Sequence, residues 1–227
     1  LAPEDFAILP WSWTPNDKTK LEDIYNCGFN LAGFVAPDSL DNVAAAGLKG
    51  IVSDGSIHAG DDTAKFDDAE ITKRVRAAVE RVKKHPAVYG YYLRDEPAAN
   101  MFPTLAKWAA AVREAAPDAK AYLNLFPIYA SGPQLSTGSY EQYVDDFVKM
   151  VKPQFISYDN YSLMDDGSLR DGYFQNLEVV RTVALRHKLP FWNIVLSNSH
   201  FHYAEPTEAN LRFQAYTSLA YGVRGIS

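Results

Sequence analysis

The feature that most constrains the fold of this chain is a regular alternation of short apolar runs with amphipathic segments. The apolar runs lie at residues 6–11, 30–35, 50–53, 88–93, 121–126, 154–159, 191–197 and 223–227. Between them, apolar residues recur three and four positions apart at residues 17–28, 38–47, 69–85, 103–117, 139–153, 176–188 and 207–222. Continuously apolar strands that alternate with amphipathic helices indicate a parallel sheet covered by helices.

Eight strands with seven helices between them predict an α/β fold, the (β/α)8 or TIM barrel, formed as one domain by residues 1–227. An open doubly wound sheet is the alternative. That fold usually carries a glycine-rich turn after its first strand, and residues 11–17 contain no glycine. Because the chain ends within the expected eighth strand, we expect it to be part of a longer polypeptide.

Composition and motif content argue against several classes of binding partner and cofactor. The net charge of −6 and the pI of about 5.4 argue against nucleic acid or an anionic membrane as the main partner. No apolar run approaches the roughly 20 residues that a membrane-spanning helix needs, so no membrane span is expected. The single cysteine, Cys27, excludes an internal disulfide framework. No nucleotide-binding glycine motif, serine nucleophile elbow or zinc-binding HExxH motif occurs, and we expect no cofactor.

Polar and aromatic residues gather where the expected strands end. Chemistry in barrels of this type is located at the carboxyl ends of the strands. The residues found there are Trp11 and Trp13 (first strand), Asp54 (third), Arg94, Asp95 and Glu96 (fourth), Asn124 (fifth), Asp159 and Tyr161 (sixth), and Asn193, Asn198 and His200 (seventh). The opposite strand ends carry turn residues and surface charges. This asymmetry predicts an active face.

Several of these residues have two interpretations. A partly desolvated carboxyl at a strand end, such as Glu96, can have a raised pKa and act as a general acid and base, or it can simply pair with Arg94. Asp95 is interpreted as a structural partner of Arg94 or of a backbone N–H. Asp159 is either a second catalytic carboxyl or a loop cap. Asp54 lies in Ser-Asp-Gly-Ser, a typical turn.

Three stretches carry a family resemblance. They read HPAVYGYYLRDEP (85–97), PFWNIVLSNSH (190–200) and PTEANLRFQAYTSLAYGVRGIS (206–227). The chain resembles the catalytic barrel of the large retaining clan of (β/α)8 glycoside hydrolases, and its last stretch is similar to bacterial polysaccharide-degrading proteins. Strand 4 of that clan commonly ends in Asn-Glu-Pro with the Glu as acid/base. The resemblance implies that Glu96 is the acid/base and that Asp95 replaces the usual Asn.

The chain departs from this pattern at strand 7, where the clan has its nucleophilic Glu. No acid follows this strand before Glu205, which lies late in the loop. Glycosidase chemistry requires two carboxyls across the scissile bond, one to protonate the leaving oxygen and one to attack or to activate water. We expect Asp159 to be the second carboxyl.

The expected function is therefore hydrolysis of a glycosidic bond in an oligo- or polysaccharide, outside the cell or in the periplasm. Glu96 and Asp159 are the expected catalytic residues. The expected substrate-binding residues are Trp11, Trp13, Asp54, Arg94, Asp95, Asn124, Tyr161, Asn193, Asn198 and His200. One alternative is a non-catalytic carbohydrate-binding protein on a degenerate hydrolase barrel. Another is a metal-dependent sugar isomerase or hydrolase that uses Asp54, Glu96, Asp159 and His200.

Overall fold

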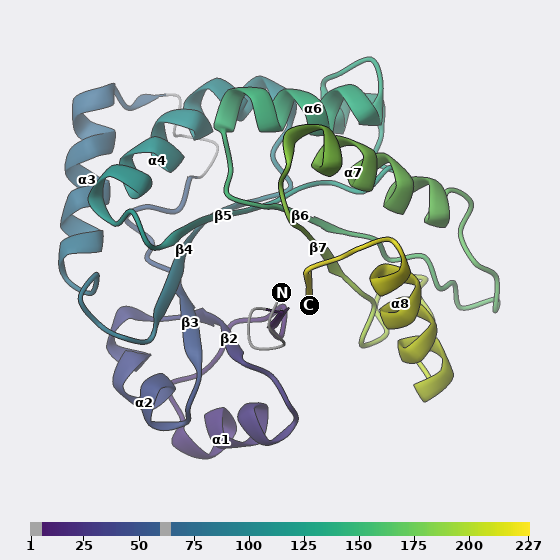
Figure 1. Ribbon diagram of the computed structural model, residues 1–227, viewed down its shortest axis with the longest axis horizontal. Coiled ribbons are helices and arrows are strands. Elements are labelled where there is room, and N and C mark those ends of the chain that lie inside the picture. The colour runs from purple at the N-terminus through teal and green to yellow at the C-terminus, as the bar shows by residue number, and fades with distance from the viewer. Residues whose placement is uncertain (1–5, 60–64) are drawn as a thin grey trace.

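A computed structural model describes residues 6–59 and 65–227, and within them it shows the expected alternation (Figure 1). The strands are β1 (Ala7–Ile8), β2 (Leu31–Val35), β3 (Lys49–Val52), β4 (Val88–Asp95), β5 (Lys120–Asn124), β6 (Ile156–Asp159), β7 (Phe191–Ile194) and β8 (Gly225–Ile226). Each of the predicted apolar runs forms a strand. Several strands, β1 and β8 above all, are shorter than their apolar runs.

The predicted amphipathic segments form the helices on the outside of the strands. They are α1 (Lys18–Asn26), α2 (Leu40–Ala45), α3 (Asp68–Glu80), α4 (Phe102–Ala115), α6 (Tyr140–Val151), α7 (Tyr173–His187) and α8 (Glu208–Ala220), with a short extra helix α5 (Gly132–Leu135). Side chains of Asp17, Ser139 and Thr207 accept a backbone N–H at the starts of α1, α6 and α8. These caps satisfy N–H groups that the helix itself leaves free. No helix in the described part of the chain is long and apolar enough to cross a membrane.

The strands are parallel and follow one another around a ring. They form two four-stranded sheets with the orders β1-β8-β7-β6 and β2-β3-β4-β5. A single parallel bridge joins the sheets at each seam, between Trp13 and Phe34 and between Leu125 and Tyr158. Figure 1 shows the ring with α1 to α4 and α6 to α8 arranged around it. The expectation of an α/β fold of the TIM-barrel type is confirmed.

A glycine allows one of these seams to form. A Cβ atom placed on Gly33 of β2 would lie 2.2 Å from the carbonyl oxygen of Ser12 and 2.5 Å from that of Pro10. Both oxygens belong to rigid backbone, so a larger residue would push the first strand segment away from β2. The close approach of the two segments therefore requires glycine at this position.

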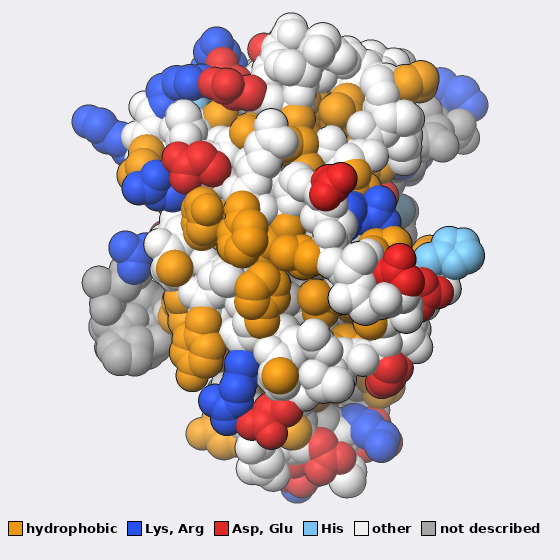
Figure 2. Space-filling model, turned by 90° about the vertical axis from the view of Figure 1, so that its right-hand side faces the viewer, with side chains coloured by type: hydrophobic (Ala, Val, Ile, Leu, Met, Phe, Trp, Pro, Cys, Tyr) orange, Lys and Arg blue, Asp and Glu red, His pale blue; other side chains and the backbone are white. Residues whose placement is uncertain are grey.

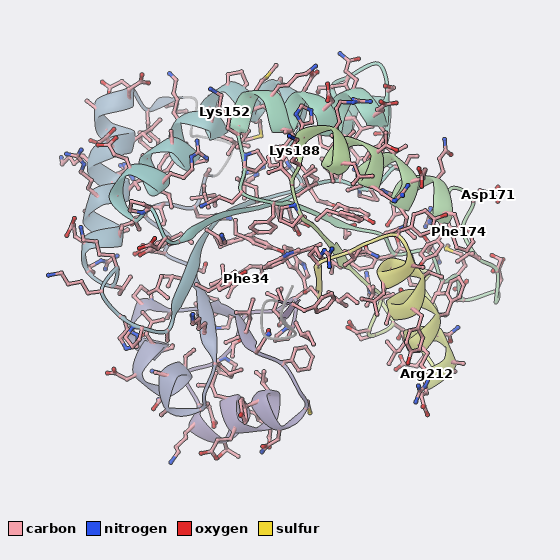
Figure 3. All side chains as sticks on the ribbon, in the orientation of Figure 1. Phe34, Lys152, Asp171, Phe174, Lys188 and Arg212 are labelled. Carbon is pink, nitrogen blue, oxygen red and sulfur yellow. The ribbon has the colours of Figure 1, made fainter. Side chains whose placement is uncertain are left out.

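Two apolar cores explain why the strands are apolar on both faces. The outer core lies between strands and helices and includes Tyr91, Trp108 and Phe147. The inner core fills the ring with side chains from most of the strands, namely Ala7, Leu9, Leu31, Phe34, Ile51, Tyr122, Phe155 and Trp192. Phe34 points into the ring in Figure 3. Because side chains fill the ring, polar groups for chemistry can only collect at its open end.

Helix α8 differs from the other helices because its buried residues, Gln214 and Ser218, are polar. Its outer side exposes apolar side chains, Leu211, Tyr216 and Leu219. Figure 2 shows a broad patch of apolar side chains on the side of the molecule that carries α7 and α8.

Candidate active site

A strained turn places Glu96 at the carboxyl end of β4. Glu96 has a φ of +42°, in the left-handed region that non-glycine residues rarely adopt. Two hydrogen bonds hold the turn: the Glu96 N–H donates to the Asn124 carbonyl at 2.9 Å, and the Tyr143 hydroxyl donates to the Pro97 carbonyl at 2.7 Å. A conformation of this kind costs free energy and persists only where the surrounding structure imposes it. The turn fixes the direction of the Glu96 side chain.

Asn124 on β5 connects a carboxyl at the end of β4 with a carboxyl at the end of β6. Its Nδ2 donates to Oδ1 of Asp95 and to Oδ1 of Asp159, at 3.0 Å in each case. The Ser157 hydroxyl donates to its Oδ1 at 2.9 Å, which fixes the orientation of the amide. A further hydrogen bond of 2.9 Å joins Ser157 to the hydroxyl of Tyr122. Asn124, Ser157 and Tyr122 are at most 1% exposed, so this network is a rigid support beneath the carboxyls.

The carboxyls of Glu96 and Asp159 are neighbours, and each of them affects the pKa of the other. Burial, reinforced by the charge of Asp95, raises the pKa of Glu96 from 4.5 to about 7, although the neighbouring Asp159 carboxyl opposes the rise. Burial and then the charge of Glu96 hold the pKa of Asp159 well above its usual range. Burial also raises the pKa of Asp95. Neighbouring carboxyls in a poorly solvated site cannot all ionise, so this cluster retains a proton at neutral pH.

Such a cluster is suited to proton transfer. A carboxyl whose pKa lies near 7 is present in both its protonated and its ionised form at neutral pH, so it can donate and then accept a proton in one reaction cycle. Glu96 has this property, and Asp159 is a neighbouring carboxyl that affects its pKa.

Aromatic rings cover the inner side of the site. The rings of Trp11 and Phe34 are 4.8 Å apart, those of Phe34 and Tyr92 are 4.2 Å apart, and Tyr122 completes the group. The ring of His58 stacks on Tyr92 at 5.3 Å. Burial, followed by the charge of Arg94, lowers the pKa of this histidine. Because the half-buried Trp11 packs against Phe34 and Tyr122, it is the tryptophan that the structure brings to the carboxyl ends of the strands.

The loops after β5, β6 and β7 form a second aromatic group. The ring of Tyr161 lies 5.2 Å from that of His200 and 5.7 Å from that of Tyr203. The Tyr161 N–H donates to the hydroxyl of Tyr129 at 3.2 Å. Burial, followed by the charge of Asp159, raises the pKa of both Tyr129 and Tyr161. These tyrosines therefore lie within electrostatic reach of the carboxyl cluster and remain neutral.

Other residues predicted for the site are engaged elsewhere. Asp54 accepts hydrogen bonds from the N–H and hydroxyl of Ser56 and pairs with Arg81, as expected of a turn aspartate. Asn193 is fully buried and donates to the Ser218 hydroxyl of α8 at 2.9 Å. Its side chain thus points outward from the ring of strands, whereas the carboxyls occupy the end of the ring.

Three more predicted residues lie toward the edge of the site. Trp13 is 55% exposed, and it lines a pocket next to α1 together with Lys20 and Phe29. Asn198 is exposed in the loop after β7. Arg94 donates to the Ala59 carbonyl at 3.0 Å, and its charge acts on Asp95.

Sequence reasoning missed Tyr92, Tyr129, Arg170 and Tyr203. The last three come from separate loops and meet only in the folded chain, so no local motif marks them. Tyr92 lies within β4, in an apolar run that predicts only a buried strand. No group of His, Cys, Asp and Glu side chains in residues 6–59 and 65–227 has an arrangement that could hold a metal ion.

Known structures share the fold of this chain, although no protein-family model and no curated protein matches its sequence. A glycoside hydrolase family 5 protein from Bacteroides vulgatus is 11% identical with a TM-score of 0.71, over 98% of this chain and 57% of that one. The β-galactosidase from the psychrophilic Marinomonas ef1 is 11% identical with a TM-score of 0.67, over 97% and 53%. The β-amylase catalytic domain from Paenibacillus polymyxa is 10% identical with a TM-score of 0.67, over 98% and 92%.

The chain thus spans little more than half the length of the first two of these proteins. At identities of 10–11% the likeness establishes the fold alone. The resemblance to glycoside hydrolase barrels is thus confirmed for the fold.

Proposed function

We propose that this chain hydrolyses a glycosidic bond in an oligo- or polysaccharide, with Glu96 as the acid/base. The observation that carries the proposal is the carboxyl cluster at the open end of the ring, where Asn124 bridges Asp95 and Asp159 and burial raises the pKa of Glu96 to about 7. The fold adds support, because proteins named as a family 5 glycoside hydrolase, a β-galactosidase and a β-amylase share it.

Glu96 in its protonated form would donate a proton to the leaving oxygen as the glycosidic bond breaks, and would then take a proton from the attacking water. Asp159 would be the second carboxyl. The carboxyls of retaining enzymes are about 5 to 5.5 Å apart, and those of inverting enzymes about 6.5 to 9.5 Å. Asn124, which donates to Asp159, would hold this carboxyl in place while substrate binds.

Substrate would lie against the two aromatic groups. Trp11 offers a ring on which a sugar can stack, while Tyr161 and His200 offer polar groups to sugar hydroxyls near Asp159. This chemistry requires no cofactor. One carboxyl protonates the leaving oxygen, and the other attacks the sugar or activates water.

The test measures both product release and sugar binding. Purified protein is incubated with a panel of α- and β-linked oligosaccharides, and new reducing ends are measured for the wild type and for Glu96→Gln. Loss of general acid catalysis is expected to lower the rate by about 100- to 10,000-fold. Glu205→Gln is the matched control, because Glu205 is an exposed carboxylate of the loop after β7 and should retain full activity. Full activity of Glu96→Gln would contradict the assignment.

A carbohydrate-binding protein without catalysis is the second candidate. It is favoured by the absence of a carboxyl directly after β7, where Val195, Leu196 and Ser197 follow the strand. This candidate predicts sugar binding in a calorimetric titration, no release of reducing ends from any substrate, and the same affinity for Glu96→Gln as for the wild type.

A further inference from the structure

Arg170 is held among tyrosines next to the candidate active site. Its guanidinium carbon lies 4.2 Å from the centre of the Tyr129 ring and 5.5 Å from that of Tyr203. Its Nη2 donates to the Tyr203 hydroxyl at 3.5 Å. Its backbone N–H donates to the Ser162 carbonyl at 2.7 Å, within a hairpin in which Leu163 pairs with Leu169. Backbone and ring contacts therefore fix the position of the guanidinium.

Arg170 makes no ion pair with any residue in the described part of the chain, and its buried Nε has no hydrogen-bond partner there. Arginines with an Asp or Glu partner include Arg74, Arg76, Arg81, Arg181, Arg186 and Arg212. A partly desolvated cation without an anionic partner costs free energy, and two ring faces offset only part of that cost. The guanidinium of Arg170, a planar group with five N–H donors, is thus held in place without an anionic partner in the described part of the chain.

Tyr129 links Arg170 to the carboxyl cluster. One face of the Tyr129 ring lies against Arg170, while its hydroxyl accepts the Tyr161 N–H and is within reach of the charge of Asp159. The charges with the largest effects on the carboxyl cluster are the carboxyls themselves, together with Arg94 and His58 at Asp95. Arg170 therefore lies one tyrosine away from the proposed reaction centre without serving as its counter-ion.

We propose that Arg170 binds an anionic substituent, a carboxylate or a sulfate, on a sugar unit of the substrate. The fork of a guanidinium matches the oxygens of such groups and can bind them with two parallel hydrogen bonds. A cation is needed for this purpose here, because Asp95, Glu96 and Asp159 would otherwise repel an anionic saccharide. This inference rests on the proposed function, since it assumes that the site binds a saccharide.

The test is calorimetric titration of the Glu96→Gln protein, which binds sugars without turnover under the proposed function. The ligands are oligogalacturonates and their carboxyl-reduced forms, and sulfated galactan oligosaccharides and their desulfated forms. Arg170→Met is expected to bind the matching anionic ligand about 10- to 100-fold more weakly and its neutral form less than about 2-fold more weakly. The control is Arg181→Met, an exposed ion-paired arginine of α7, which should change neither affinity.

Two results would overturn the inference. One is an equal loss of affinity for the charged and the neutral forms, which is the result expected if Arg170 only holds the three loops together. The other is unchanged or undetectable binding of both anionic ligands. Arg170→Lys keeps the charge and loses the fork, so it should bind the anionic ligand with intermediate affinity even if Arg170→Met fails to fold. Binding that depends on Arg170, without hydrolysis by the wild type, would support the anion site and reject the hydrolase.

Discussion

Replacing Glu96 by Gln should stabilise the protein at pH 8 and have little effect at pH 4. The pKa of Glu96 is raised in the folded protein from 4.5 to about 7, so the folded state binds this proton more tightly than the unfolded chain does. A carboxyl of this kind contributes its full stability below its unfolded pKa, and the contribution is lost as the pH rises through about 7. Gln keeps the shape of the protonated side chain and cannot ionise.

The size of the effect follows from the pKa. A rise from 4.5 to about 7 corresponds to about 3 kcal/mol for a fully shielded group. Glu96 is partly exposed, and solvent screening reduces this to about 1–2 kcal/mol. The left-handed backbone at this position is the same in both proteins and does not enter the difference.

Urea unfolding followed by tryptophan fluorescence at pH 4, 6 and 8 measures the effect. The free energy of unfolding of Glu96→Gln should exceed that of the wild type by about 1–2 kcal/mol at pH 8, and the excess should vanish at pH 4. Glu205→Gln, made at an exposed carboxylate, should show no such trend. A Glu96→Gln protein that gains nothing between pH 4 and pH 8 would refute the argument that a buried charge is held at this position.

Four further substitutions test the Asn124 network, the first seam of the ring and the two tryptophans. Asn124→Leu removes both donated hydrogen bonds, so it should raise the pKa of Asp159 further, lower kcat/KM and reduce the unfolding free energy by about 1–3 kcal/mol, measured by pH–rate profiles and urea unfolding. Gly33→Ala should destabilise the first seam of the ring by about 1–3 kcal/mol in the same unfolding assay, because its Cβ meets rigid backbone. Trp11→Ala should raise KM in steady-state assays, whereas Trp13→Ala should leave KM unchanged, because the Trp13 side chain lies in the pocket next to α1.

The strand positions could be predicted because strands such as β2, β6 and β7 are buried on both faces. Residues such as Phe155 pack inside the ring, while Tyr158 packs under the helices, and together they produce continuous apolar runs. The same double burial hides which face a polar residue takes. Trp192 points inward and Asn193 outward, and no alternation in Phe-Trp-Asn-Ile distinguishes the two. For this reason the sequence predicts a substrate-binding role for Asn193, whereas in the structure its side chain contacts Ser218 of α8.

The chemistry of strand 4 could also be predicted, because a carboxyl before a proline at a strand end is a local pattern. The contacts around it are not local. Asn124 bridges Asp95 and Asp159 only because β5 lies between β4 and β6 in the ring. Arg170 and Tyr129 meet through two loops whose paths depend on a hairpin, and the sequence alone does not place them together.

The pH dependence of kcat/KM for saccharide hydrolysis tests the central claim most directly. If Glu96 must be protonated to act as the general acid, kcat/KM should fall on the alkaline side with a midpoint near pH 7, set by the pair that Glu96 forms with Asp159. The alkaline fall should disappear from the residual activity of Glu96→Gln. A profile that stays flat to pH 9 in the wild type would contradict the assignment of Glu96 as the proton donor.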